Sequence, residues 1–335
     1  MMMGSDTDEN NKNAIQTLIS HGINFFDSAE IYDLGKCETA LGKAIKELNI
    51  PREKIVVTTK IFRNGNDPND SFLSRKHIIE GVNQSLKRLQ MDYVDVVFCH
   101  RPDRNTPIEE TCRAMNYVIE KGWAFYWGTS EWDADQIMLA YKICENLKLI
   151  RPIVEQSQYN FLHRDRIERE YANLFKNFKL GITVWSPLFS GVLTGKYLKN
   201  VPDDSRYKKH KELNGYGLDY YFKNKKMIDE KLEKLQNLAK NKFNCSLAQL
   251  SIAWIIANPD ISTVILGSTK MNQVEEIIPA LEISKKLDKE ILKEIEEILN
   301  NASVRPWDYK TINLLKNRRN DLHDIDYIKN QDFVK

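Results

Sequence analysis

Four polar residues lie at or just after the ends of three consecutive strand-like segments. Asp27 ends the apolar segment INFFD, Tyr32 lies in the loop after it, Lys60 ends KIVVTTK and His100 ends YVDVVFCH. In a barrel of parallel strands, the carboxyl ends of neighbouring strands converge on one mouth. An Asp, a Tyr, a Lys and a His at one mouth could polarise a carbonyl group and deliver a proton to its oxygen.

Each of the four residue types has a task in such a reaction. The phenol of free tyrosine has a pKa of about 10, and a neighbouring ammonium lowers it because it favours the phenolate. Lys60 could act in this way on Tyr32, while Asp27 could pair with Lys60 and keep it charged. A neutral His100 could donate a hydrogen bond to the carbonyl oxygen. None of these side chains supplies a hydride, so a reduction would also need a nicotinamide cofactor.

Taken singly, each residue has a simpler interpretation. An Asp at a strand end is often a helix N-cap or a turn residue, and a lone Tyr usually serves packing. Lys60 could be solvated, and His100 could open a turn in which charges pair. The occurrence of all four in order, on three successive strand ends, favours the catalytic interpretation.

Composition indicates a soluble globular protein. The 335 residues are 42% hydrophobic and 29% charged, and 49 basic against 47 acidic residues give a formal charge of +2. These fractions are typical of a soluble globular protein. Because the charges nearly cancel, the protein has no overall electrostatic field that would attract nucleic acid. The five cysteines are scattered and show no zinc-ligand spacing, so we expect reduced thiols in a cytosolic protein.

The sequence does not predict membrane insertion or export. No apolar run approaches the roughly 18 residues of a membrane span. The start, MMMGSDTDENNKN, is polar and acidic and lacks the features of a signal peptide. We therefore expect a cytoplasmic protein, or one that is peripheral at the membrane through a protein partner.

Strand-like and helix-like segments alternate along the chain. Helical periodicity is clearest in 9–21, 74–89 and 107–120, and further helices are expected at 270–281 and 286–300. Apolar segments of strand length occur at 23–27, 54–60, 93–99, 124–129, 153–159, 181–187 and 262–268. This alternation predicts an α/β fold, a (β/α)8 TIM-type barrel. Only seven strands are found, so either the barrel is incomplete or the chain lacks its natural beginning.

Two stretches interrupt the alternation. The loop 61–72 follows Lys60 directly and should border the mouth, and the Tyr-rich insertion 197–224 resembles a mobile flap. The expected organisation is a disordered start over 1–8, a barrel over 9–310 that contains the insertion, and a charged tail over 311–335.

The order of these motifs resembles the aldo-keto reductase family, over about residues 14–310. INFFDSAEIYDLGKCETALGKAIKE is similar to the family's Asp/Tyr segment, and VVTTKIF, DYVDVVFCHRPD, YWGTSEW, EQSQYN, WSPLFSGVLTGKY and VILGSTKMNQVEE match later segments in order. Within the family the chain is most similar to the β subunits of voltage-gated potassium channels. That likeness rests on the stretch from SRKHIIEGVNQSLKRL to YWGTSEW.

The resemblance implies NADPH/NADP+ bound across the mouth and a catalytic tetrad of Asp27, Tyr32, Lys60 and His100, with Tyr32 as general acid. Ser130 and Gln156 match positions that bind the nicotinamide carboxamide, and Trp185 matches an aromatic residue stacked on its ring. The remaining cofactor positions implied are Ser186, Pro187, Leu188, Gly191 and Lys196 along the pyrophosphate, Arg206 in the insertion, and Gly267, Thr269, Gln273 and Glu276 around the adenosine and its 2′-phosphate.

Three departures from the family pattern bear on function. The position of His100 is usually Asn in the channel β subunits, so His here favours retained catalysis. Glu131 replaces a basic residue expected beside Ser130. The family's N-terminal hairpin and its first strand, with a Gly-Thr-Trp type segment that touches the cofactor, are not found.

Three hypotheses follow. The first is an NADPH-dependent reductase of small aldehydes or ketones. The second is a weakly active, NADPH-binding regulatory subunit that docks, as a homotetramer, on the α subunit of a voltage-gated potassium channel. The third is a truncated, inactive product. The sequence does not identify the physiological carbonyl substrate.

Overall fold

A parallel sheet lies at the centre of the molecule. The computed structural model describes residues 8–203, 205, 208, 217–267 and 271–303. Within these residues the sheet has seven strands, each paired in parallel with the next in chain order. The strands are β1 Phe25–Asp27, β2 Val56–Ile61, β3 Val94–Cys99, β4 Ala124–Ser130, β5 Val154–Gln158, β6 Gly181–Trp185 and β7 Thr263–Val264.

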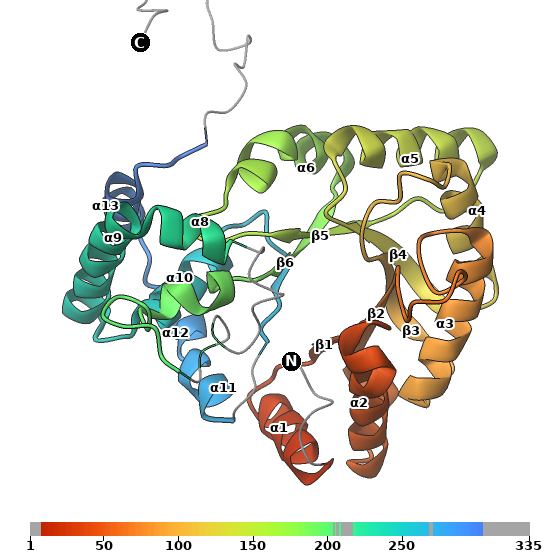
Figure 1. Cartoon of the computed structure of the whole chain (residues 1–335), viewed down its shortest axis with the longest axis horizontal. Coiled ribbons are helices and arrows are strands. Elements are labelled where there is room, and N and C mark those ends of the chain that lie inside the picture. The colour runs from red at the N-terminus through yellow and green to blue at the C-terminus, as the bar shows by residue number, and fades with distance from the viewer. Residues whose placement is uncertain (1–7, 204, 206–207, 209–216, 268–270, 304–335) are drawn as a thin grey trace, which may run out of the picture.

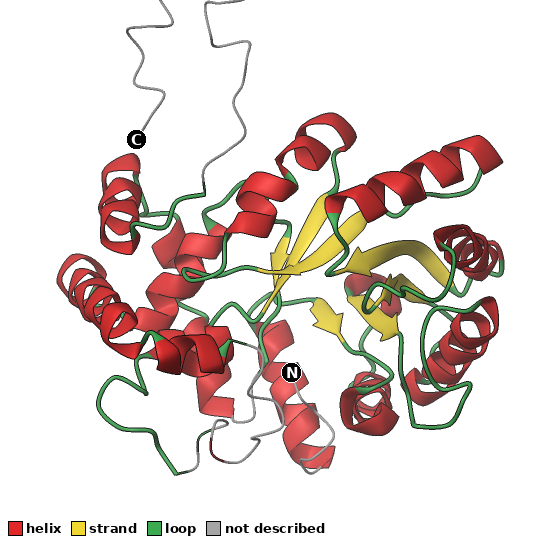
Figure 2. Ribbon diagram, turned by 45° about the horizontal axis from the view of Figure 1, so that its top comes forward, coloured by secondary structure: helices red, strands yellow, loops and turns green. Residues whose placement is uncertain are grey.

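Helices form an outer layer around the strands (Figures 1 and 2). Most of them connect one strand to the next, as expected for parallel strands joined by crossovers. They are α1 Asp8–Ser20, α2 Lys36–Glu47, α3 Arg75–Leu89, α4 Ile108–Glu120, α5 Ala134–Leu147, α6 Ala172–Phe178, α8 Leu218–Lys223, α9 Lys225–Leu238, α10 Leu247–Ile256, α11 Met271–Ile277, α12 Ala280–Ser284 and α13 Lys289–Leu299.

Helix α3 shows how the sequence produces these elements. The Ser74 hydroxyl accepts a hydrogen bond from the His77 backbone N–H at 3.2 Å and caps the first turn. Ile78, Val82 and Leu89 recur at helical spacing and are completely buried. The helix ends at Gln90, which adopts a left-handed conformation with φ 55°. The predicted segment 74–89 is therefore confirmed.

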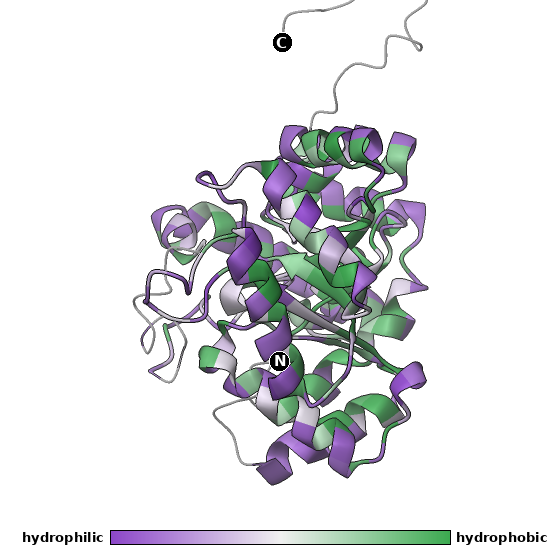
Figure 3. Ribbon diagram, turned by 90° about the vertical axis from the view of Figure 1, so that its right-hand side faces the viewer, coloured by the Kyte–Doolittle hydropathy of each residue, from purple (hydrophilic) through white to green (hydrophobic). Residues whose placement is uncertain are grey.

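The main hydrophobic core lies between the strands and the helices. Apolar residues face inward on the helices and polar residues face outward (Figure 3). A second, small cluster consists of Val96, Phe98 and Val154. It fills the inside of the curled sheet, because Phe98 and Lys60 are register partners and Lys60 points to the mouth.

The sheet curls far enough to bring distant strands together. The Gln156 amide on β5 lies 3.4 Å from the Asp27 carboxylate on β1, and it donates a hydrogen bond to it. Among the described residues, β1 pairs only with β2, and β7 pairs only with β6. The structure thus confirms a curled (β/α) sheet, while an eighth strand and the absence of a hairpin stay predictions.

Two predicted segments need correction. The last strand is only Thr263–Val264, much shorter than 262–268. The predicted helix 270–281 is two helices, α11 and α12, which are separated at Pro279, a residue without a backbone N–H to donate. In the predicted flap 197–224, Tyr197 and Tyr221 are completely buried, and the flap itself stays a prediction.

The predicted disordered start and charged tail lie almost wholly outside the described residues. Asp8, predicted within the disordered start, is the first residue of α1. Residues 1–7 and the predicted tail 311–335 lie outside the described residues, as do 204, 206–207 and 209–216 within the insertion.

Candidate active site

The structure brings the four predicted tetrad residues together at the carboxyl end of the sheet. Asp27 ends β1, Lys60 lies near the end of β2 and His100 directly follows β3. Tyr32 begins a short 3-10 turn after β1. The Lys60 ammonium donates to the Asp27 carboxylate, to the Ser28 carbonyl oxygen at 2.7 Å and to the Tyr32 hydroxyl at 3.3 Å.

The charge on Lys60 is kept by its partners. The side chain has no exposed surface, and burial alone lowers the pKa of an ammonium. The attraction of Asp27 and Tyr32 outweighs this effect, so the pKa of Lys60 is raised above its ordinary value. Lys60 is therefore a cation in contact with the Tyr32 phenol.

Asp27 is held in place from two further sides. The Thr58 hydroxyl, on the neighbouring strand, donates to one carboxylate oxygen at 2.6 Å, and the Gln156 amide donates to the same oxygen. The other oxygen accepts from Lys60. These bonds fix the ion pair that in turn fixes the ammonium against Tyr32.

His100 packs against Tyr32 as a neutral ring. The two ring centroids are 5.7 Å apart and the ring planes are nearly perpendicular. Burial, with smaller contributions from the positive charges of Lys60 and Arg101, holds the pKa of His100 well below its ordinary value. A neutral imidazole carries one N–H donor and one acceptor, so it can donate to a carbonyl oxygen without changing charge.

A cavity of about 480 Å³, the mouth cavity, opens at the carboxyl ends of β3 to β6, and Arg101, the residue after His100, lines it. Trp185 and Glu131 form part of its wall, and the Gln158 side-chain nitrogen in that wall has no hydrogen-bond partner among the described residues. Its remaining lining residues are Arg101, Leu162, His163, Phe189, Gly217 and Tyr220. The sequence does not predict Gln158 or these remaining residues as part of the site. Two signals could have indicated them, since Arg101 follows His100 directly and Gln158 lies within the EQSQYN segment.

Ser130 and Gln156 lie side by side at the ends of β4 and β5, where they are register partners. The Ser130 hydroxyl donates to the Gln156 carbonyl oxygen at 2.9 Å and accepts from the Arg101 guanidinium at 3.1 Å. The Arg101 guanidinium also lies 5.4 Å from the Trp185 ring. The predicted carboxamide-binding and stacking residues are thus neighbours at one wall.

The loop after β6 has an unusual backbone. Ser186, Phe189 and Ser190 have φ values of 51°, 46° and 55°, and such left-handed conformations of non-glycine residues cluster at functional sites. Gly191 has φ 89°, a conformation that residues with a side chain rarely adopt, and the Lys196 ammonium lies beside it.

The other predicted positions of this loop are also close by. Pro187 and Leu188 lie between Trp185 and the 3-10 turn Phe189–Thr194. Their backbone carries the chain from the stacking residue to Gly191.

The residues predicted around the adenosine are described only in part. Gly267 follows β7 and has open space where a Cβ would be. Gln273 and Glu276 lie on α11, and the Glu276 carboxylate accepts from the Ser246 hydroxyl at 3.2 Å. Arg206 and Thr269 lie outside the described residues, so their placement stays a prediction.

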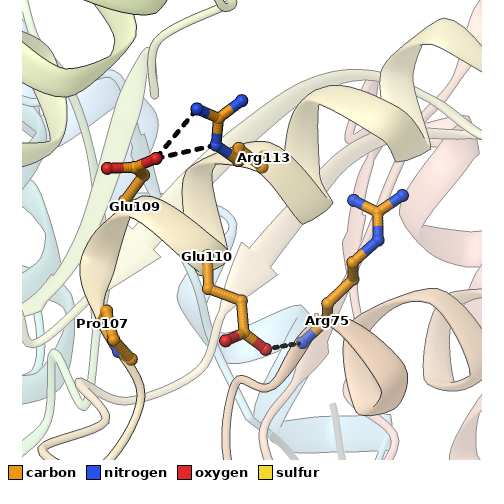
Figure 4. A pocket seen from close by; sticks show the side chains of 5 residues that line it. All are labelled: Arg75, Pro107, Glu109, Glu110 and Arg113. Carbon is orange, nitrogen blue, oxygen red and sulfur yellow. Dashed lines mark hydrogen bonds and ion pairs between the residues drawn. The ribbon is translucent and has the colours of Figure 1, made fainter.

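A second hollow, of about 510 Å³, lies between the N-terminal ends of α3 and α4 (Figure 4). Its polar groups satisfy one another: Glu109 pairs with Arg113 at 2.9 Å, and Glu110 accepts from the Arg75 backbone N–H at 2.8 Å. The Arg75 guanidinium packs on the Tyr117 ring. None of the tetrad residues lines either hollow. The mouth cavity is the better candidate for chemistry, because it lies at the carboxyl ends of the strands, where the tetrad also lies.

Comparison with known proteins identifies the family to which the chain belongs. The family model of the aldo/keto reductase family matches residues 1–300, and the chain belongs to that family. It is similar to proteins named as probable voltage-gated potassium channel subunits beta, 48% identical in Arabidopsis thaliana and 47% identical in Oryza sativa. Each match covers 89% of this chain and 90% of the relative. A putative β subunit of Schizosaccharomyces pombe is 45% identical, with 87% and 85% covered. The predicted resemblance is confirmed.

Among the described residues, no helix has the length and apolar character needed to cross a membrane. No group of three or more potential metal-binding side chains occurs among them.

Proposed function

We propose that this chain reduces aldehydes or ketones with NADPH, with Tyr32 as the general acid. The observation that carries the proposal is the buried Lys60 ammonium, which is bonded at once to Asp27 and to the Tyr32 hydroxyl. A buried cation in contact with a phenol at the carboxyl ends of the strands has a direct chemical use, since it stabilises the phenolate that forms when the phenol donates its proton.

The proposed reaction needs two transfers. A nicotinamide cofactor, when bound, supplies a hydride to the carbonyl carbon. Tyr32 donates its proton to the carbonyl oxygen, and Lys60 stabilises the phenolate that remains. His100, as a neutral donor, orients the carbonyl oxygen toward Tyr32. Asp27 would touch neither the carbonyl group nor the cofactor, and it acts by holding Lys60 in place.

The cofactor would be held by residues already near one another. Ser130 and Gln156 would bind the carboxamide, and Trp185 would stack on the ring. Gly191 and Lys196, in the loop after β6, would contact the pyrophosphate. The open donor of Gln158 supports a polar ligand at this wall, since a buried donor without a partner is costly.

The test is oxidation of NADPH in the presence of a reactive aldehyde such as 4-nitrobenzaldehyde, followed by absorbance. The wild-type protein should turn over and Tyr32→Phe should lose about a hundredfold or more, the usual weight of a general acid. Tyr117→Phe is a matched control, because it removes a phenol on the outer helix α4. If wild type and Tyr32→Phe are equally inert while both bind NADPH, the proposed activity is wrong.

A second candidate function is suggested by the names of the relatives. A protein that binds NADPH, turns over slowly and docks on a potassium channel would keep the cofactor site but need no efficient general acid. Its test is co-purification with the cytoplasmic part of a channel, together with the mass of the assembly. Binding as a tetramer without turnover would favour this function over the first.

A further inference from the structure

Glu131 occupies a special position in the wall of the mouth cavity. It directly follows β4 and has a left-handed backbone with φ 59°, which is uncommon for a residue with a side chain. Its side chain is 20% exposed, and one carboxylate oxygen accepts two hydrogen bonds. The donors are the Trp185 indole N–H and the Gln158 backbone N–H, each at 2.7 Å.

The second carboxylate oxygen faces a positive charge. It lies 3.7 Å from the Arg166 guanidinium, which also pairs with Asp133 at 3.1 Å. Hydrogen bonds to a carboxylate are about twice as strong as hydrogen bonds between neutral groups. The Glu131 carboxylate thus lies between the Trp185 indole N–H on one side and the Arg166 guanidinium on the other.

Two groups therefore constrain the Trp185 ring, one at its N–H edge and one over its face. The carboxylate of Glu131 accepts from the indole N–H, while the Arg101 guanidinium lies over the ring at 5.4 Å. A ring fixed at its N–H edge keeps one plane, whereas a ring held only by packing can tilt. A flat partner stacks well only on a ring that already has the right plane.

We propose that Glu131 is a positioning residue that holds the plane of Trp185 for stacking against the nicotinamide. The second half of this statement rests on the proposed function. It also explains the departure noted in the sequence: the side chain beside Ser130 is acidic here because it faces an indole N–H and a backbone N–H.

The first test is a double-mutant cycle read as the Kd for NADPH. Glu131→Ala should weaken binding about tenfold in the wild-type background, the loss expected for a hydrogen bond to a charged acceptor. In a Trp185→Phe background, which has no indole N–H, the same change should cost about threefold or less. Glu131→Gln keeps an acceptor oxygen and should stay within about threefold of wild type.

Two outcomes of this cycle would overturn the proposal. One is an equal loss in both backgrounds, which would assign Glu131 a general structural role. The other is a Glu131→Gln variant as weak as Glu131→Ala.

The second test needs no cofactor. The near-ultraviolet circular dichroism of Trp185 is the difference between each protein and its Trp185→Phe counterpart. Glu131→Ala should diminish this difference and Glu131→Gln should keep it, with far-ultraviolet spectra confirming that each variant is folded. An unchanged signal in Glu131→Ala would overturn the positioning role. A diminished signal in a protein that binds no NADPH would keep that role and defeat the proposed function.

Discussion

Lys60 carries its charge in a place without solvent contact, so its removal should be costly. In Lys60→Met the Asp27 carboxylate would stay buried without its cation, and breaking such a pair costs about 3–5 kcal/mol. We expect urea unfolding to show a loss of this size and Asp27→Asn/Lys60→Met to recover part of it. Lys76→Met is the control, because Lys76 forms an exposed pair with Glu80 worth about 0.5 kcal/mol. Equal losses for Lys60→Met and Lys76→Met would contradict the buried pair.

His100 should make the protein less stable in mild acid. Its pKa is lowered in the folded state, whereas the unfolded chain takes up a proton near the ordinary value of about 6.5. The unfolded state thus binds more protons below that pH, and the free energy of unfolding falls as pH drops through it.

The comparison with His100→Asn isolates this contribution. Relative to the variant, wild type should lose stability between pH 7.5 and pH 5.5 in urea unfolding. His77 has a raised pKa, so its contribution has the opposite sign: it is present in acid and lost as pH rises. It is common to both proteins and cancels. A stability difference that does not change with pH would show that His100 is not buried as a neutral ring.

At the scale of elements, Gly128 on β4 lets three strands pack inside the barrel. A Cβ there would lie 2.5 Å from the Val154 carbonyl oxygen and 2.8 Å from the Phe98 ring. Gly128→Ala should therefore destabilise the protein by about 1–3 kcal/mol through overpacking. Gly181→Ala, on β6, is the matched control, since its nearest atom would be 3.4 Å away. Denaturant midpoints of the two variants check the prediction, and identical midpoints would contradict it.

The elements themselves could largely be predicted from the sequence, because apolar segments such as 93–99 and amphipathic ones such as 74–89 have a clear period. The errors have local causes. The apolar residues of 262–268 predicted a strand of seven residues, whereas β7 has two residues and both are half-buried. In the Tyr-rich insertion, no periodicity distinguishes the buried tyrosines from the others, and tertiary packing buries Tyr197 and Tyr221.

The site could be predicted where the backbone fixes it and not where distant side chains do. Strand ends gave Asp27, Lys60 and His100. The buried charge of Glu30 was not foreseen, because its partner His77 comes from α3, 47 positions away. In the same way, no local pattern indicates that Glu131 bonds to Trp185.

At the scale of the whole molecule, the cofactor would contact residues from β4, β5 and the loop after β6. NADPH should therefore raise the melting temperature of the entire protein, with about 2.7 kcal/mol of stabilisation at a hundred times the Kd. Calorimetry with and without NADPH checks this. A chain with no cooperative transition and no response to NADPH would support the truncated, inactive alternative.

The most direct test of the central claim follows the hydride itself. NADPH deuterated at the transferred position of C4 is incubated with the protein and 4-nitrobenzaldehyde, and the alcohol is analysed by mass spectrometry. The proposed reaction predicts one deuterium on the carbinol carbon with wild type, and almost no alcohol with Tyr32→Phe. Alcohol without deuterium, or no alcohol from a wild-type protein that has bound NADPH, would contradict it.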